Sequence, residues 1–145
     1  MSTIKVDTYL TRGGASEIAI DKLKGVSSAS SISVVAEGGT NTTNLQQGLA
    51  KSWSKHDNTG TISITDSFNL TSISDEGTGI ADFTLTNSFS NANYSIVATC
   101  SDTSGHMQIV DHVQATGSYR YRTLNSSFDL VDDPSVYGNT HGDLA

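Results

Sequence analysis

The sequence is poor in positive charge, and it lacks long apolar runs. Its 145 residues include 8 Lys and Arg against 15 Asp and Glu, for a formal net charge of −7. Nonspecific nucleic-acid binding depends on Lys and Arg side chains that neutralise phosphates, so this balance excludes nucleic acid as an expected partner. No run of about 18 apolar residues occurs, and we therefore expect no membrane insertion.

Cysteine is equally scarce, since Cys100 is the only one. An internal disulfide is thereby excluded. The surrounding segment, residues 95–100, is typical of a buried strand, so we expect Cys100 to be a small core side chain. The N-terminus Met1–Lys5 lacks the basic and then apolar pattern of a secretory signal. We expect a protein that is made and kept in the cytosol, or that leaves the cell by lysis.

Motifs for catalysis, cofactors and metals are missing as well. There is no Gly-x-Ser-x-Gly, and Gly77-Thr78-Gly79 lacks the third glycine and the helix of a phosphate-binding loop. His106 and His112 are six residues apart, whereas strand histidines sharing a metal are better placed two apart. Asp132-Asp133 before Pro134 is typical of a turn, although adjacent carboxylates also occur in calcium sites. We predict no enzyme, no cofactor and no metal site.

The apolar fraction is low for a globular protein. Hydrophobic residues make up 35% of the chain, against roughly 45–50% in typical domains. Charged residues make up only 16%, too few for a solvated disordered tail. This composition suits thin β-structure that buries its surface against copies of itself.

The first forty residues show the pattern of an extended β arm. Apolar and polar residues alternate over residues 3–10, where Ile4, Val6 and Leu10 share one side. The apolar pieces that follow are too short and too separated to enclose a core, and their burial cannot offset the ordering of the chain unless other chains pack around them. We predict an attachment and oligomerisation arm over residues 1–40, with Ile4, Val6 and Leu10 as its contacts, in a homotrimer.

The rest of the chain, residues 41–145, has the pattern of an antiparallel β-sandwich with a jelly-roll-like arrangement. Segments rich in β-branched and aromatic residues recur about every 10 residues between Gly, Asn and Asp, as in sandwich domains. The expected strands are residues 61–65, 67–73, 82–86, 94–99, 107–113, 118–124, 126–131 and 135–137.

The segment around Trp53 is ambiguous from its pattern. Leu45, Leu49 and Trp53 lie on one helical stripe, whereas Leu49, Lys51, Trp53 and Lys55 also alternate as in a strand. Gly48 weakens the helical alternative.

The segment Ser118–Arg122 carries two tyrosines on one face of an expected strand and two arginines on the other. One interpretation packs the tyrosines and leaves the arginines solvated or paired with acids. The other makes Tyr119, Arg120, Tyr121 and Arg122 a receptor-binding or subunit interface, because Tyr and Arg are enriched at interfaces.

Several stretches of the sequence resemble a module common in marine phages. The stretch from Leu45 to Trp53, with its Gln-Gly-x-Ala-Lys-x-Trp, and its continuation through residues 58–75 are similar to that module. Residues 82–86 and 90–97 match its next two strands, and residues 2–8 match the usual opening of such chains. The resemblance is to tail-fibre-like virion proteins of cyanophages and pelagiphages, and it also favours a strand at Trp53.

This resemblance implies a virion structural protein in which trimers of a distal β-sandwich sit on an N-terminal attachment arm. We expect a short tail fibre or fibre segment that contacts other tail proteins and presents the sandwich to a host-surface glycan. The alternative is an assembly adaptor or capsid decoration protein that contacts only virion proteins. We expect Trp53 to lie in the core or at a subunit seam, and not in a ligand platform; exposure of surface aromatics in a groove would favour receptor binding.

Overall fold

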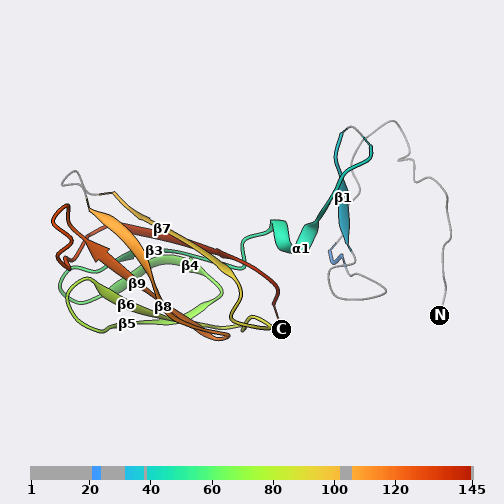
Figure 1. Cartoon of the computed structure of the whole chain (residues 1–145). Helices are drawn as coiled ribbons and strands as arrows, with labels where there is room; N and C mark the ends of the chain where they lie inside the picture. The colour runs from blue at the N-terminus through green and yellow to red at the C-terminus, as the bar shows by residue number, and fades with distance from the viewer. Residues whose placement is uncertain (1–20, 24–31, 38, 102–105, 145) are drawn as a thin grey trace, which may run out of the picture.

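The regular secondary structure in the described part of the chain consists almost entirely of β-strands (Figure 1). The computed structural model describes residues 21–23, 32–37, 39–101 and 106–144. Its elements are β1 (Ser33–Val35), β2 (Thr42–Asn44), α1 (Leu45–Gly48), β3 (Ser52–Asp57), β4 (Ser63–Phe68), β5 (Leu70–Asp75), β6 (Ile80–Leu85), β7 (Ser95–Cys100), β8 (Met107–Ala115), β9 (Ser118–Leu124) and β10 (Val136–His141). The predicted all-β class is confirmed.

Eight of the strands form two antiparallel sheets that pack as a sandwich (Figure 1). One sheet has the order β4-β3-β10-β7 and the other has the order β5-β6-β9-β8. The pairs β3–β4, β5–β6 and β8–β9 are neighbours both along the chain and within a sheet. Hairpins therefore account for three of the six strand pairings in the two sheets. The predicted sandwich is confirmed, whereas the strand order is not the pair of Greek keys of a jelly roll.

The core consists of aromatic rings from one sheet that pack against small groups from the other. Phe83 on β6 and Tyr119 and Tyr121 on β9 are at most 1% exposed, and the Phe83 ring lies 5.0 and 4.9 Å from the two tyrosine rings. The buried inward residues of the facing strands β3 and β10 are Ser52, Ser54, His56, Val136, Gly138 and Thr140. Close approach requires glycine at Gly138, because a Cβ there would lie 2.2 Å from the Tyr121 hydroxyl.

Asn69 forms the corner at which the chain passes from one sheet to the other. It has a φ of 60° between β4 and β5, and its side chain donates to the carbonyl oxygens of Lys51 (2.9 Å) and Asn87 (3.1 Å). Its Oδ1 accepts from the Asn87 backbone N–H at 2.7 Å. The single strand expected over residues 67–73 is therefore wrong, since its two halves belong to different sheets.

A second expected strand, over residues 126–131, is also not formed. Asn125 instead closes a turn, because its Oδ1 accepts from the backbone N–H groups of Ser127 (2.8 Å) and Asp129 (3.0 Å). Phe128 in this turn has a φ of 66° and is 70% exposed. Local side-chain hydrogen bonds compete here with strand pairing.

The segment around Trp53 contains a short helix followed by a strand, so both of the structures that its pattern indicated are present. The short helix α1 begins after Asn44, whose side chain accepts from the Gln47 N–H, and it ends at Gly48. Strand β3 then contains Trp53, so the strand favoured by the resemblance is confirmed at that residue.

The predicted boundary between residues 40 and 41 lies inside a hairpin. Strands β1 and β2 pair with Val35 opposite Thr42, on either side of that boundary, and Figure 1 shows them beside α1 and outside the sandwich. The structure places the start of the sandwich at β3. The predicted arm contacts Ile4, Val6 and Leu10 lie outside the described residues.

Candidate functional site

Strand alternation gives the sheet β4-β3-β10-β7 an outer face with an unusual row of side chains. Ser52, Ser54 and His56 point inward on β3, so Trp53 and Lys55 point outward. The register then aligns four outward residues across the sheet, namely Phe68, Trp53, Asn139 and Val97. Tyr137 occupies the neighbouring row, opposite Lys55 and Thr99.

Four of these outward residues form an exposed apolar surface. Trp53 is 39% exposed, Phe68 51%, Val97 57% and Tyr137 38%. We call these four residues the aromatic face. Contiguous exposed apolar surface on a soluble protein marks an interaction site.

A shallow groove lies among three residues of the aromatic face and is not lined by Phe68. It has a volume of about 260 Å³, and its walls include Trp53, Val97, Tyr137, Thr99 and Asn139. The Lys55 ammonium lies 5.8 Å from the centre of the Tyr137 ring, within the range of a cation–π contact. The groove therefore combines flat aromatic surface with an amide and a hydroxyl group at its edge.

The expectation for Trp53 needs correction. A core position for Trp53 is wrong, because Trp53 points to the same side of β3 as Lys55 and is 39% exposed. A position at a subunit seam stays a prediction. The alternation of Ser52, Ser54 and His56 against Trp53 and Lys55 puts Trp53 and Lys55 on one face of the strand, but it does not indicate which face is buried. The sequence pattern does not single out Phe68, Val97 or Tyr137, whose grouping with Trp53 depends on the pairing of four separate strands.

Strand β9 carries the two tyrosines and two arginines, and it fits the interpretation in which the tyrosines are packed and the arginines are solvated or paired with acids. Tyr119 and Tyr121 are each 1% exposed and lie inside the sandwich, so they do not belong to a receptor or subunit surface. Arg120 donates from Nε and Nη2 to the two carboxylate oxygens of Asp82, with 2.7 Å for the Nη2 bond. Arg122 is exposed on the same outer side, and an interface role for the two arginines stays a prediction.

Burial disfavours ionisation of the core tyrosines, because it removes water from around their hydroxyl groups. It raises the pKa of Tyr119 and, more strongly, the pKa values of Tyr94 and Tyr121. These hydroxyl groups therefore stay neutral in the folded protein. Tyr94 donates to the backbone oxygens of Ala115 and Ser118 at 2.9 Å each.

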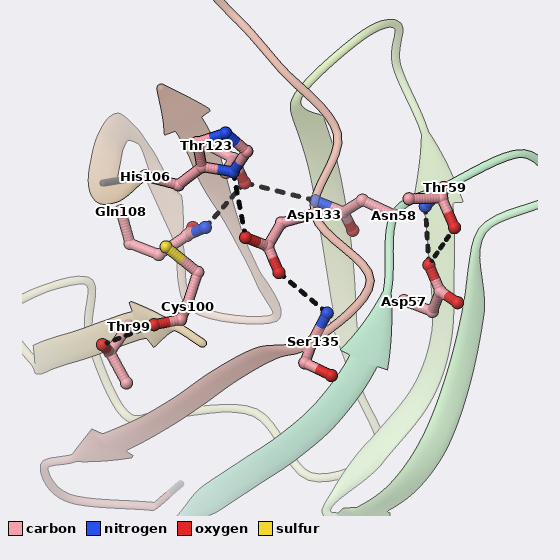
Figure 2. A network of polar contacts seen from close by, with 10 residues as sticks. All are labelled: Asp57, Asn58, Thr59, Thr99, Cys100, His106, Gln108, Thr123, Asp133 and Ser135. Atoms are coloured by element: carbon pink, nitrogen blue, oxygen red, sulfur yellow. Dashed lines mark hydrogen bonds and ion pairs between the residues drawn. The ribbon is translucent and has the colours of Figure 1, made fainter. Parts of the chain in front are cut away.

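A polar network closes one end of the sandwich (Figure 2). Asp133 is fully buried; its Oδ2 lies 3.0 Å from His106 Nδ1, and its Oδ1 accepts from the Ser135 N–H at 2.8 Å. Thr123 accepts hydrogen bonds from the side-chain amides of Gln108 (2.6 Å) and Asn58 (3.4 Å). The network joins separate parts of the chain, since Asn58 follows β3, Gln108 and Thr123 lie on the β8–β9 hairpin, and Asp133 lies in the β9–β10 loop.

The Asp132-Asp133 pair lies in the loop between β9 and β10 and contributes to the network. Asp132 accepts from the Gly79 N–H at 2.7 Å, while the Asp133 carbonyl accepts from the Asn58 N–H at 3.0 Å. These bonds attach the β9–β10 loop to two hairpin turns. Cys100, expected in the core, is half-buried at the end of β7 near this network.

His56 is a buried titratable group on the sheet that faces the aromatic rings. Its ring is fully buried, 4.9 Å from the Phe83 ring. Desolvation lowers the pKa of His56 to about 4, against the attraction of the Asp57 and Asp133 carboxylates. Its Nε2 has no hydrogen-bond partner among the described residues, so the neutral ring packs as an aromatic group.

A second, more polar pocket lies where α1 meets the sandwich. It has a volume of about 290 Å³. The polar side chains on its wall are Gln47, Asn91, Asn93, Ser95, His141 and Asp143. We call it the polar pocket.

Within the described part of the chain, no three His, Cys, Asp or Glu side chains are arranged to hold a metal ion. No helix among the described residues is long and apolar enough to cross a membrane. No known protein family, curated protein or solved structure matches the chain.

Proposed function

We propose that this protein is a virion structural protein of the phage tail-fibre type. In this proposal it is a homotrimer that is attached to other tail proteins through its N-terminal segment. The sandwich then faces the host surface, where the aromatic face takes part in attachment to a glycan. The resemblance of residues 2–8 and 45–97 to tail-fibre-like proteins supports the class, and the β-sandwich is compatible with it.

The exposed aromatic face is the observation that carries the attachment role. Trp53 and Tyr137 present flat ring surface in an open groove, beside the polar side chains of Thr99 and Asn139. Sugar rings have apolar C–H faces that stack on aromatic rings, and hydroxyl groups that bond to amides and hydroxyls. Exposure in a groove is the arrangement that favours receptor binding over burial at a seam.

The alternative is an assembly adaptor or capsid decoration protein, and the width of the aromatic face favours it. Phe68 and Val97 lie at opposite edges of the sheet, on β4 and β7, and are the most exposed members of this face. An apolar row across four strands also suits the surface of a protein partner. In that case another virion protein covers the groove.

Substitution of Trp53 distinguishes these possibilities. Trp53→Ala removes an outward side chain, so we expect a stability loss of about 1 kcal/mol or less, compared with about 3–5 kcal/mol for a buried Trp. Phe128→Ala is the matched control, because Phe128 is an exposed aromatic residue in the β9–β10 loop. Both variants are compared with the parent for melting temperature and for binding to an array of bacterial surface glycans.

Loss of glycan binding in Trp53→Ala alone, with a nearly unchanged melting temperature, supports the attachment role. If neither the parent nor the variants bind any glycan, while Trp53→Ala fails to assemble with virion proteins, the adaptor alternative holds. A light-scattering mass near that of one chain, 15.3 kDa, contradicts the homotrimer.

A further inference from the structure

The polar pocket is lined differently from the groove of the aromatic face. Three of its side chains are amides, from Gln47, Asn91 and Asn93, and Asp143 is its carboxylate. Amides both donate and accept hydrogen bonds, whereas a carboxylate only accepts. The wall is therefore suited to a ligand with several groups that can do both.

Packing holds the sandwich side of the pocket in place. The Phe89 and Tyr94 rings stack with centroids 3.9 Å apart. The chain crosses this stack at Gly142, where a Cβ would lie 2.6 Å from the Tyr94 Cβ. The Asp143 carbonyl then accepts from the Ser90 N–H at 2.9 Å, which fixes the backbone that carries the carboxylate.

The helical side of the pocket is fixed by a buried lysine. Lys51 is 7% exposed, and its ammonium donates to the carbonyl oxygens of Gln46 and, at 2.8 Å, Leu49. These bonds attach the C-terminal end of α1 to the start of the sandwich. Gln47 on α1 can then reach across the pocket, where its Nε2 lies 3.4 Å from Asp143 Oδ2.

Asp143 has an acceptor that the protein does not use. Its Oδ1 is shielded from solvent and has no hydrogen-bond partner among the described residues. An unsatisfied buried acceptor is costly, and more so in a charged group. A ligand that donates a hydrogen bond to Oδ1 would remove this cost.

We propose that the polar pocket binds a neutral polyhydroxylated molecule the size of one sugar ring. One hydroxyl donates to Asp143 Oδ1, and others bond to the amides of Asn91 and Asn93. The Asp143 carboxylate disfavours anionic ligands. Calcium ordinarily requires six to eight oxygen ligands, several of them carboxylates, and the pocket has one carboxylate. This site is separate from the aromatic face and does not depend on the attachment role.

Nuclear magnetic resonance of the full chain tests the proposal directly. D-glucose, D-galactose and N-acetyl-D-glucosamine are added separately at millimolar concentration, and backbone amide shifts are followed. We expect at least one sugar to shift the amides of Asn93, Ser95 and Gly142. Asp143→Asn keeps the shape of the side chain but removes its charge, and should weaken binding about tenfold or more.

Phe128→Ala is the control, because Phe128 is exposed in the β9–β10 loop and lines neither the polar pocket nor the groove of the aromatic face, so this variant should leave the binding unchanged. Asn93→Ala provides a second pocket variant if Asp143→Asn does not fold. The proposal is overturned if none of the three sugars shifts the pocket amides, or if ammonium or calcium ions shift them and the sugars do not. Shifts confined to Trp53 and Tyr137 also overturn it, while they support the separate role of the aromatic face.

Discussion

His56 should make the stability of the protein depend on pH in the mildly acidic range. Its imidazole is fully buried against Phe83 and Tyr121. Burial lowers the pKa of His56 in the folded protein from 6.5 to about 4. Asp57 and Asp133 raise it by attraction, but the loss of hydration dominates. The folded state therefore binds this proton less readily than the unfolded chain does.

The sign and size of the effect follow from proton linkage. Between pH 6.5 and about 4, His56 is protonated in the unfolded chain and neutral in the folded protein, so added protons favour unfolding. Its contribution to stability is complete above pH 6.5 and declines as the pH falls toward 4. A pKa difference of one corresponds to about 1.36 kcal/mol, and the total effect is about 3 kcal/mol. Against a typical stability of about 5–15 kcal/mol, such a change is readily measured.

Urea denaturation at several pH values between 7.5 and 4 measures this dependence. His56→Gln is the control, because glutamine does not titrate while all other titratable groups stay the same. The difference in unfolding free energy between parent and variant should change by about 3 kcal/mol across this range. Equal pH slopes in the two proteins would refute the reasoning. So would a His56 ring whose resonances titrate near pH 6.5 in the folded parent, a measurement that needs no variant.

Three further predictions concern packing, a corner and the domain boundary. Gly138→Ala should destabilise the sandwich by about 1–3 kcal/mol in urea denaturation, with partial recovery when Tyr121→Phe removes the clashing hydroxyl; an unchanged midpoint contradicts the packing. Asn69→Ala should lower the melting temperature, and Asn69→Gly should lower it less, because glycine adopts a positive φ freely; the reverse order argues against backbone strain at the corner. A chain that starts at Thr43 should melt cooperatively by circular dichroism, since the sandwich begins at β3; absence of a β signal would show that the N-terminal segment belongs to the fold.

The sequence by itself determined the fold class and the location of most strands. Period-two alternation is a local property, and the expected strand at residues 118–124 coincides with β9. The two incorrectly predicted strands, over residues 67–73 and 126–131, occur where the hydrogen bonds of one asparagine side chain override the alternation of apolar and polar residues. Asn69 turns the chain into the other sheet, and Asn125 bonds to its own turn.

Only the tertiary structure decided which face of each strand is buried and which residues meet. Trp53 and Lys55 lie outside because Ser54 and His56 fit against the aromatic rings of the other sheet, and such a fit depends on both sheets at once. Phe68 and Val97 join Trp53 in one row only through the pairing of β4, β3, β10 and β7. Both candidate sites combine residues from distant parts of the chain, and the alternation within one strand does not specify its neighbour.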